Sequence, residues 1–244
     1  MHRYQPNMGW GPGQGRTTPA VRALLIANVA VFLLQSVLNL VGTRPPGFHS
    51  TAWMMFIDVF GLSPPKALLG FYVWQPVTYL FLHGGLMHVG MNMLMLWIFG
   101  TSLERHWGTR QFLKYYFICG IGAGLITCAL AYNSPPTIGA SGAIFGLLLA
   151  YGYLWPNNVI LIWGIIPMKA RTMVLLFGGL ELYSLVFGGS GNIAYAAHLG
   201  GMLVGFLYLK RAWRVGPFVN DLKWRLRRRR FRVMDKRDDD FPFH

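Results

Sequence analysis

Four polar side chains, each in an apolar stretch, could carry out chemistry together. Ser141 lies in "TIGASGAIFG", which runs into the apolar "LLLAYGYLW", and His198 opens "HLGGMLVG". His88 and Asn92, in "HGGLMHVGMN", are four residues apart and so share one face of a helix. A serine hydroxyl attacks an acyl carbon when a base accepts its proton and N–H donors stabilise the oxyanion. Imidazole suits the task of the base because it exchanges protons near neutral pH.

Composition indicates where these side chains lie. Of the 244 residues, 54% are hydrophobic and 12% are charged, whereas about a quarter of the residues of an ordinary soluble domain are charged. Apolar runs close to the spanning length of about 20 residues recur along the chain. The sequence therefore predicts a polytopic membrane protein. Cys119 and Cys128, nine residues apart on one predicted helix, are about 13 Å apart, too far for a disulfide, and are expected to pack.

Six apolar stretches predict an all-α fold with six transmembrane helices. The connection after the first stretch is long, and its apolar "TAWMMFIDVFGL" is too short to span, which favours an interfacial helix. The chain then divides into a flexible N-terminal arm (1–19), a six-span core (20–210) and a basic tail (211–244). The arm is polar and rich in Gly and Pro, unlike a signal peptide. The predicted spans are 21–42, 76–103, 112–132, 140–155, 172–188 and 194–209.

The distribution of positive charge predicts the orientation of these spans. Six crossings place both termini on one side, and all of the 22 Lys and Arg except Arg44 and Lys66 fall on that side. By the positive-inside rule this side is cytoplasmic. The tail, with "KWRLRRRRFR", is expected to lie near anionic lipid headgroups. Nucleic-acid binding is disfavoured because no stacking platform or folded reader accompanies the basic run.

The predicted topology places the polar side chains at one depth. The second, fourth and sixth spans all enter from the outer face, so His83, His88, Asn92, Ser141 and His198 fall in the outer half of the bilayer. The fourth span reaches only about 24 Å against a hydrocarbon core of about 30 Å. We therefore expect Ser141 at the floor of a water-filled pocket, because only protein or water can satisfy the backbone before it.

Small residues predict how Ser141 and His198 approach each other. Gly201 and Gly205 follow His198 on one helix face, and Gly142 and Gly146 follow Ser141 on another. Such small-xxx-small patterns allow two helices to come close. Each feature alone also fits a purely structural role, because small residues crowd the helix interfaces of any membrane protein. A nucleophile, a base and two donors at one depth on three helices favour catalysis.

Three of these segments resemble a known family. "GASG", "AHLGGMLVG" and "HGGLMHVGMN" are similar to the signature segments of the rhomboid intramembrane serine proteases, and the resemblance covers roughly 20–210, including "WQPVTYLFLH" and "GTSLERHWG". It implies that Ser141 is the nucleophile and His198 the general base of a Ser–His dyad. It also implies that His88 and Asn92 stabilise the oxyanion.

The resemblance implies further supporting residues. Phe145 matches an aromatic that packs beside the histidine, while Glu104 and Gly108 match a structural turn on the cytoplasmic side. His83 and the glycines of the motifs are expected to support the site. The family commonly has Trp-Arg where this chain has Trp74-Gln75, a pair expected to support the first loop rather than the chemistry. The supporting glycines are Gly139, Gly142 and Gly201.

The resemblance implies an endopeptidase, without metal or cofactor, that cleaves other membrane proteins in or beside their transmembrane segments in a bacterial-type plasma membrane. One alternative is a catalytically silent relative that binds membrane clients. Another is a transporter or channel, which would need polar residues continuing to the inner leaflet, and these are scarce apart from Glu181. An intramembrane carboxyl is a candidate for function. We expect Glu181 to be neutral and deeper than His198, and not to be a third catalytic member.

Overall fold

A computed structural model describes residues 17–43, 49–162, 165–188 and 194–210 of the chain. The predicted N-terminal arm, apart from residues 17–19, and the basic tail (211–244) lie outside these described residues. The compact unit Met1–Leu207 contains every side chain of the candidate site. Within it the described residues are mostly helical, as predicted, although not exclusively so.

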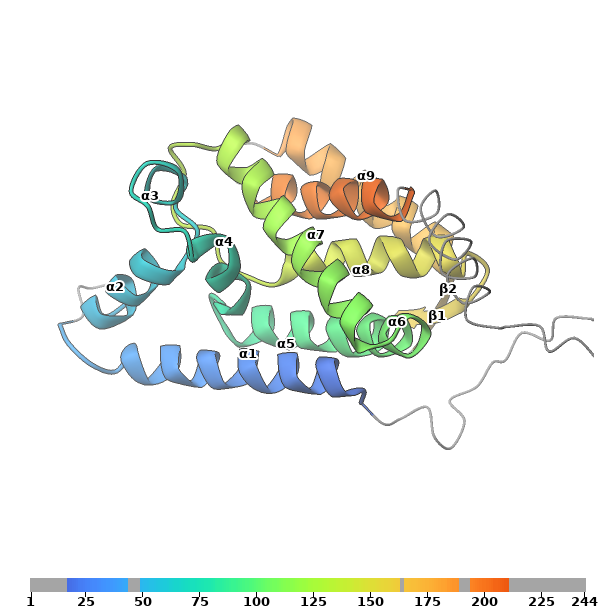
Figure 1. The fold of residues 1–244 in the computed structure, drawn as a ribbon, viewed down its shortest axis with the longest axis horizontal. Coiled ribbons are helices and arrows are strands. Elements are labelled where there is room, and N and C mark those ends of the chain that lie inside the picture. Colours follow the sequence, from blue (N-terminus) through green and yellow to red (C-terminus); the bar gives the residue numbers. More distant parts are fainter. Residues whose placement is uncertain (1–16, 44–48, 163–164, 189–193, 211–244) are drawn as a thin grey trace, which may run out of the picture. The chain divides into compact units, whose positions relative to one another are not determined.

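Helices occupy each of the six stretches that the sequence predicts as spans (Figure 1). For the short fourth span, predicted over 140–155, the observed helix α8 (Ser141–Leu154) begins and ends within one residue of the prediction. Cys119 and Cys128 are buried free thiols, as their spacing predicts. The helices are α1 (Pro19–Leu38), α2 (Thr51–Phe60), α3 (Pro64–Leu68), α4 (Gln75–Thr78), α5 (Leu86–Met95), α6 (Thr101–Trp107), α7 (Thr109–Leu130), α8 (Ser141–Leu154), α9 (Ala170–Phe187) and a last helix over 194–210.

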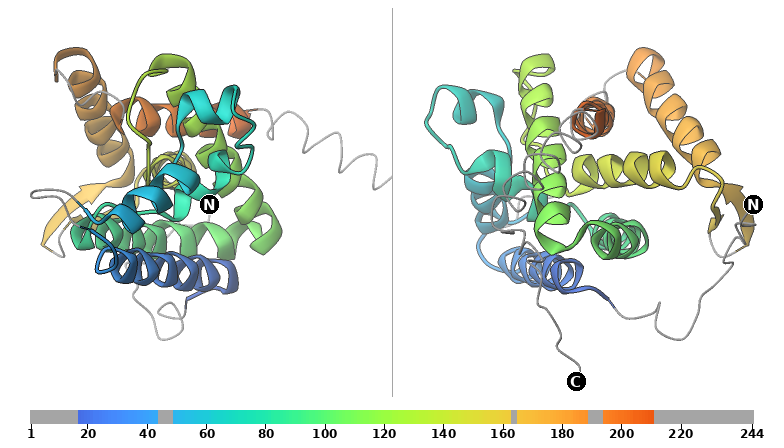
Figure 2. Two further views of the ribbon diagram at one scale, coloured as in Figure 1. Left: turned by 90° about the vertical axis from the view of Figure 1, so that its left-hand side faces the viewer. Right: turned by 45° about the vertical axis from the view of Figure 1, so that its right-hand side comes forward.

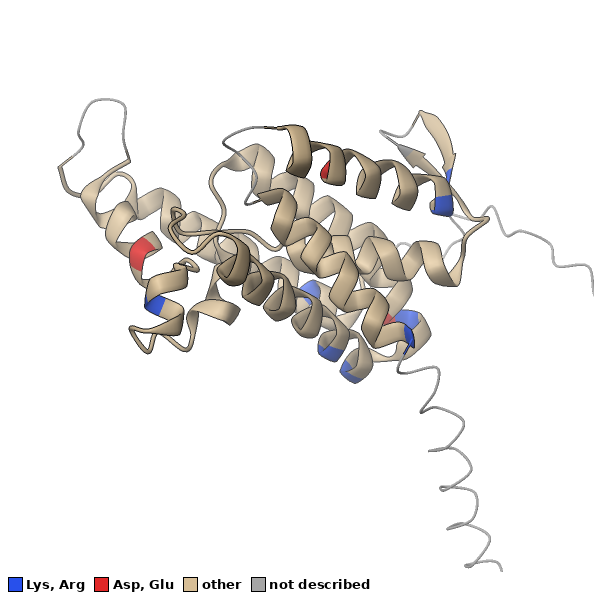
Figure 3. Ribbon diagram, turned by 90° about the horizontal axis from the view of Figure 1, so that it is seen from above, with Lys and Arg blue, Asp and Glu red and all other residues tan. Residues whose placement is uncertain are grey.

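Four of the described helical segments are long and apolar enough to cross a membrane. They are Pro19–Leu38, Leu86–Trp107, Thr109–Leu130 and Ala170–Phe187. α8, with 14 residues, is shorter and reaches only about 21 Å. Charged positions are sparse along all these helices (Figure 3). The chain is therefore a helical, multi-pass membrane protein.

The second predicted span begins later than the sequence suggests. Instead of one helix from residue 76, the structure has α4, a 3₁₀ turn at Tyr79–Phe81 (η1), and a break before α5 begins at Leu86. Gly84 and Gly85 lie at this break, and Gly85 is extended, with φ of 173°. The helix then continues through a π-helical turn at Leu96–Gly100 (η2) into α6. His83 therefore lies before the helix rather than on it.

A two-stranded hairpin connects α8 to α9, and the prediction of an all-α fold is wrong in this detail. β1 (Val159–Ile162) and β2 (Ile166–Lys169) pair antiparallel, with Val159 opposite Lys169. The hairpin fits the sequence because β-branched residues dominate β1, and such residues favour extended backbone.

α8 is the central helix of the unit. It contacts α5, η2, α6, α7 and α9, and Figure 2 shows it running between α7, α9 and the 194–210 helix. Glycine and alanine make up much of its buried surface, which allows its neighbours to approach closely. The residue that begins this buried helix, Ser141, is thereby held among several other helices.

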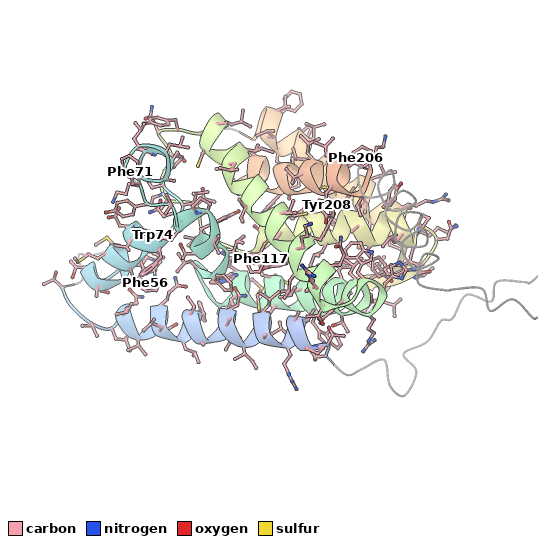
Figure 4. All side chains as sticks on the ribbon, viewed as in Figure 1. Phe56, Phe71, Trp74, Phe117, Phe206 and Tyr208 are labelled. Atoms are coloured by element: carbon pink, nitrogen blue, oxygen red, sulfur yellow. The ribbon has the colours of Figure 1, made fainter. Side chains whose placement is uncertain are left out.

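The segment between α1 and α5 is tied together by Trp74 and Gln75. The Gln75 Oε1 accepts from Ser63 N–H at 3.0 Å, and its Nε2 donates to the carbonyls of Asp58 and Val59, each at 3.2 Å. The Trp74 Nε1 donates to Val59 O at 2.9 Å, and Figure 4 shows Trp74 in the part of the fold formed by α2–α4. The pair thus joins α4 to the backbone around α2, in keeping with the predicted role in the loop.

Glu104 joins α6 to the start of α1. Its carboxylate accepts from the backbone N–H of Ala20 and Val21, each at 2.9 Å, and from the Thr109 hydroxyl at 2.7 Å. These N–H groups belong to the first turn of α1, where a helix leaves its donors free. Gly108 ends α6 with φ of +80°, a conformation that favours glycine. The predicted turn thus connects three helices.

Candidate active site

Ser141 and His198 are in hydrogen-bond contact. The Ser141 Oγ lies 2.8 Å from the His198 Nε2. The two residues are 57 positions apart in the sequence and come together because α8 begins where the 194–210 helix passes it. Ser141 is the first residue of α8, so its own N–H is among those that an α-helix leaves without an internal acceptor. A hydroxyl, a base and free N–H groups therefore converge at one point.

Close backbone contact between two glycines makes this approach possible. A Cβ at Gly201 would overlap the carbonyl oxygen of Gly142, so only glycine fits at residue 201. A Cβ at Gly142 would lie 2.7 Å from the Ala123 Cβ and 3.3 Å from the Ala197 oxygen. The predicted glycine contact is thus present for this pair. Gly205, however, faces the hydroxyl of Tyr115 rather than Gly146.

Phe145 lies flat against the imidazole of His198. The ring centroids are 4.3 Å apart and the planes differ by 8°. Phe145 follows Ser141 by one helical turn, so the same face of α8 presents both the hydroxyl and the ring. Stacking on one side, together with the bond to Ser141, fixes the plane of the imidazole.

Glu181 contacts His198, contrary to the prediction that it lies deeper. The Glu181 Oε2 is 2.9 Å from the His198 Nδ1, the nitrogen that does not face Ser141. Both side chains are largely shielded, with exposed fractions of 15% and 17%. The predicted depth is wrong because Glu181 lies only six residues before the end of α9, or about 9 Å. His198 lies four residues into the following helix, or about 6 Å from its start.

His88 and Asn92 lie beside the backbone that leads into Ser141. Gly139 has φ of +126°, and a Cβ there would lie 2.8 Å from the His88 Nε2 and 3.8 Å from the Asn92 Nδ2. The His88 Nδ1 accepts from Gly84 N–H at 3.3 Å, so in the neutral ring the proton is on Nε2, the atom facing Gly139. The Asn92 Nδ2 is buried and has no hydrogen-bond partner among the described residues. Two N–H donors therefore face the segment before Ser141.

The segment before Ser141 is held in place by backbone bonds. Thr137 and Leu62 exchange both of their N–H···O bonds, each at 2.9 Å, and Gly139 N–H donates to Tyr79 O at 2.9 Å. The Tyr79 hydroxyl in turn donates to Gly120 O at 2.6 Å. The loop that carries Gly139 is thus fixed to the first loop and, through Tyr79, to α7.

His83 lies behind His88 rather than beside Ser141. Its ring meets His88 edge-on, with centroids 5.0 Å apart, and is almost completely buried. Its backbone exchanges two bonds with the buried amide of Gln35 on α1: His83 N–H donates to Oε1 at 3.0 Å, and Gln35 Nε2 donates to His83 O at 3.2 Å. Gln35 is not among the predicted site residues, because its only signal in the sequence is an amide within the apolar first span.

Comparison with known proteins identifies the family. The sequence model of the Rhomboid domain matches residues 70–214. The chain is 35% identical to Rhomboid protein 1, mitochondrial, of Saccharomyces cerevisiae over 156 residues, which are 59% of this chain and 42% of that protein. It is 34% identical to the Rhomboid protease GluP of Bacillus subtilis over 134 residues, 54% of this chain and 25% of that protein.

A plant relative aligns over more of the chain. RHOMBOID-like protein 4 of Arabidopsis thaliana is 31% identical over 207 residues, 77% of this chain and 50% of that protein. The chain thus spans half or less of the length of each of these three relatives. The match to the Rhomboid domain covers more than half of the chain and includes Ser141, His198, His88 and Asn92. The chain belongs to the rhomboid family.

Proposed function

We propose that this protein is an intramembrane serine endopeptidase that cleaves transmembrane or membrane-adjacent segments of other proteins. The observation that carries the proposal is the 2.8 Å contact between the Ser141 Oγ and the His198 Nε2. Serine hydrolases use this contact to activate the hydroxyl. The relative GluP of Bacillus subtilis, which is named as a rhomboid protease, supports the same activity.

In the proposed mechanism, Ser141 and His198 carry the proton and the acyl group. The Ser141 Oγ–H transfers its proton to the His198 Nε2 while Oγ bonds to the scissile carbonyl carbon, and the carbonyl π electrons move onto oxygen. Collapse of this intermediate breaks the C–N bond, and the Nε2–H gives its proton to the leaving nitrogen. Water, deprotonated by the same Nε2, then hydrolyses the acyl-enzyme and restores the Ser141 hydroxyl.

We assign stabilisation of the oxyanion to three donors. They are the His88 Nε2–H, the Asn92 amide and the Ser141 backbone N–H, with the N-terminus of α8 adding the positive end of its dipole. The unpaired Asn92 Nδ2 supports this assignment, since a buried donor without an acceptor is costly. An oxyanion formed beside Gly139 would supply that acceptor. Phe145, His83, Gly139, Gly142 and Gly201 would support these groups by packing.

The substrate must present extended backbone to Ser141. Helical N–H and C=O groups in lipid are already bonded to one another, so a segment with helix-breaking residues near the membrane surface is the natural target. The short α8, which reaches only about 21 Å, supports a serine below the membrane surface and in contact with water. The family resemblance suggests a small residue before the cut and access to the serine past α9 and the first loop.

We further propose six crossings, a core over 20–210, and both termini on the cytoplasmic side. The positions of Lys and Arg support this topology. The basic tail would then lie at anionic headgroups. From the sequence we favour a bacterial-type plasma membrane as the location. The relatives include mitochondrial and plant proteins, so the comparisons do not determine the type of membrane.

Cleavage in a reconstituted membrane tests the proposal. The full-length protein is placed in liposomes with a test protein whose single transmembrane segment contains helix-breaking residues near one surface. We expect fragments with the wild type and none with Ser141→Ala. Cleavage that survives Ser141→Ala would exclude Ser141 as the nucleophile. A folded wild type that binds the test segment without cutting it would instead indicate the silent, client-binding relative.

A further inference from the structure

We infer that Glu181 is a positioning residue for His198, so that the site is a Ser–His–Glu arrangement rather than a dyad. The inference rests on the proposed function, because it concerns the base of that reaction. It departs from what the family resemblance implies for this chain, which needs no third member. In this arrangement we take Glu181 as an ionised carboxylate, in place of the neutral side chain expected from the sequence, because its Oε2 lies 2.9 Å from the His198 Nδ1. The carboxylate would act only through the histidine and would not touch the substrate.

The geometry is that of a carboxylate behind a catalytic imidazole. The ring of His198 is bridged between two oxygens: Ser141 Oγ at 2.8 Å from Nε2, and Glu181 Oε2 at 2.9 Å from Nδ1. A carboxylate can only accept, so the Nδ1 must carry a proton to make this bond. In the neutral ring Nε2 is then the unprotonated nitrogen. Glu181 thereby selects the tautomer that can accept the Ser141 proton.

The orientation of Glu181 on α9 supports a role at this site. Its side chain is only 15% exposed, whereas its neighbours Leu180, Leu182 and Tyr183 are 51%, 54% and 64% exposed. α9 therefore turns its carboxylate inward and its large apolar side chains outward. A carboxyl that faces the interior of a membrane protein is retained where it has a partner.

Packing holds α9 at the distance that this contact needs. A Cβ at Gly178, one turn before Glu181, would lie 3.2 Å from Cε of Met202, one turn after His198. The two helices therefore touch beside the Glu181–His198 bond. The other two acids among the described residues serve elsewhere: Asp58 pairs with Lys66, and Glu104 binds the start of α1. Of the three acids among the described residues, Glu181 is the one whose carboxylate contacts a histidine.

The charge of Glu181 would matter most after proton transfer. When Nε2 takes the Ser141 proton the ring becomes an imidazolium, and a carboxylate at Nδ1 stabilises that cation. Glutamine keeps the size of the side chain but loses the charge. Its amide can accept from Nδ1–H or donate to a bare Nδ1, so both tautomers of His198 become accessible.

The inference is tested by substituting Glu181 in the full-length protein and measuring the activity of each variant. We expect Glu181→Gln to lower the rate of labelling by a fluorophosphonate and the cleavage rate of the test protein about 10- to 100-fold, the range for losing one charge-assisted hydrogen bond. Glu181→Asp, which keeps the charge, should recover part of the loss. Tyr183→Phe removes a hydroxyl from the exposed face of the same helix and should stay within twofold of wild type.

The tautomer of His198 provides a readout that does not require activity. In protein labelled with ¹⁵N-histidine, at mildly alkaline pH, we expect the wild-type His198 signal to report protonated Nδ1 and bare Nε2. Glu181→Gln should shift it towards a mixture of tautomers, and His198→Ala assigns the signal. Protonated Nε2 in the wild type, or an unchanged signal and rate in Glu181→Gln, would overturn the inference.

The two readouts separate this inference from the proposed function. A wild type that labels normally, with Glu181→Gln and Glu181→Asp both within twofold of it, would reject Glu181 and leave the Ser–His reaction standing. A folded wild type that never labels would reject the reaction. The spectrum would then still decide whether Glu181 sets the tautomer of His198.

Discussion

Gly201→Ala should separate His198 from Ser141 without altering any group that takes part in the proposed reaction. The added Cβ would overlap the Gly142 carbonyl oxygen, whereas a carbon–oxygen contact of this kind needs about 3.3 Å. The 194–210 helix must therefore move away from α8 by roughly 1 Å or more. His198 lies one turn before Gly201 and Gly142 follows Ser141 directly, so the shift falls on the 2.8 Å contact itself.

The expected magnitude follows from this displacement. Overpacking of a tight interface costs about 1–3 kcal/mol of stability, which lowers the thermal midpoint but leaves a folded fraction. Misplacement of a catalytic group by about 1 Å costs on the order of 100-fold in rate. We therefore expect fluorophosphonate labelling per folded molecule to fall roughly 100-fold, far more than the loss of folded protein explains.

The assay pairs the labelling rate with thermal unfolding in the same detergent. Gly179→Ala is the matched control, because a Cβ at Gly179 meets nothing within 4 Å. It should label like the wild type. If Gly201→Ala labels within threefold of wild type while folded, the close approach of these two helices does not set the geometry of the reaction, and the reasoning is wrong.

Three further substitutions test separate parts of the account. Asn92→Ala should lower kcat for the test protein about 100- to 1,000-fold, as the loss of an oxyanion donor does, without lowering the thermal midpoint, because the Nδ2 is unpaired in the folded protein; a falling midpoint would point to a structural role. Phe145→Leu removes the stacking on His198 and should slow labelling about two- to tenfold, whereas an unchanged rate would show that the ring does not position the base. Glu104→Ala should cost about 2–4 kcal/mol of stability by freeing the start of α1 with an unchanged labelling rate per folded molecule; reduced labelling would contradict its purely structural role.

The meeting of Ser141 with His198 could be predicted because two independent patterns agree on it. Topology places both residues near the same end of their helices, and the small residues beside each allow the helices to touch. His88 and Asn92 were identifiable from their spacing of one helical turn. Phe145 followed from the resemblance to the rhomboid family, in which an aromatic at this position packs beside the histidine. Each of these signals is local, so a single sequence carries it.

Glu181, Gln35 and the start of α5 could not be predicted in the same way. The contact of Glu181 depends on how α9 packs against the 194–210 helix, which the lengths of the two spans do not determine. Gln35 bonds the backbone of His83, a partner without a sequence signal. The start of α5 at Leu86 was missed because hydropathy continues through Gly84 and Gly85 while the helix does not.

The central claim is that Ser141 is activated by His198. The most direct test is to react the purified full-length protein, shown to be folded in detergent, with a fluorophosphonate and to map the modified residue by mass spectrometry. Our account predicts a single adduct on the Ser141 Oγ in the wild type, none in Ser141→Ala, and strongly slowed labelling in His198→Ala. An adduct on another residue, or equal labelling of wild type and His198→Ala, would contradict it.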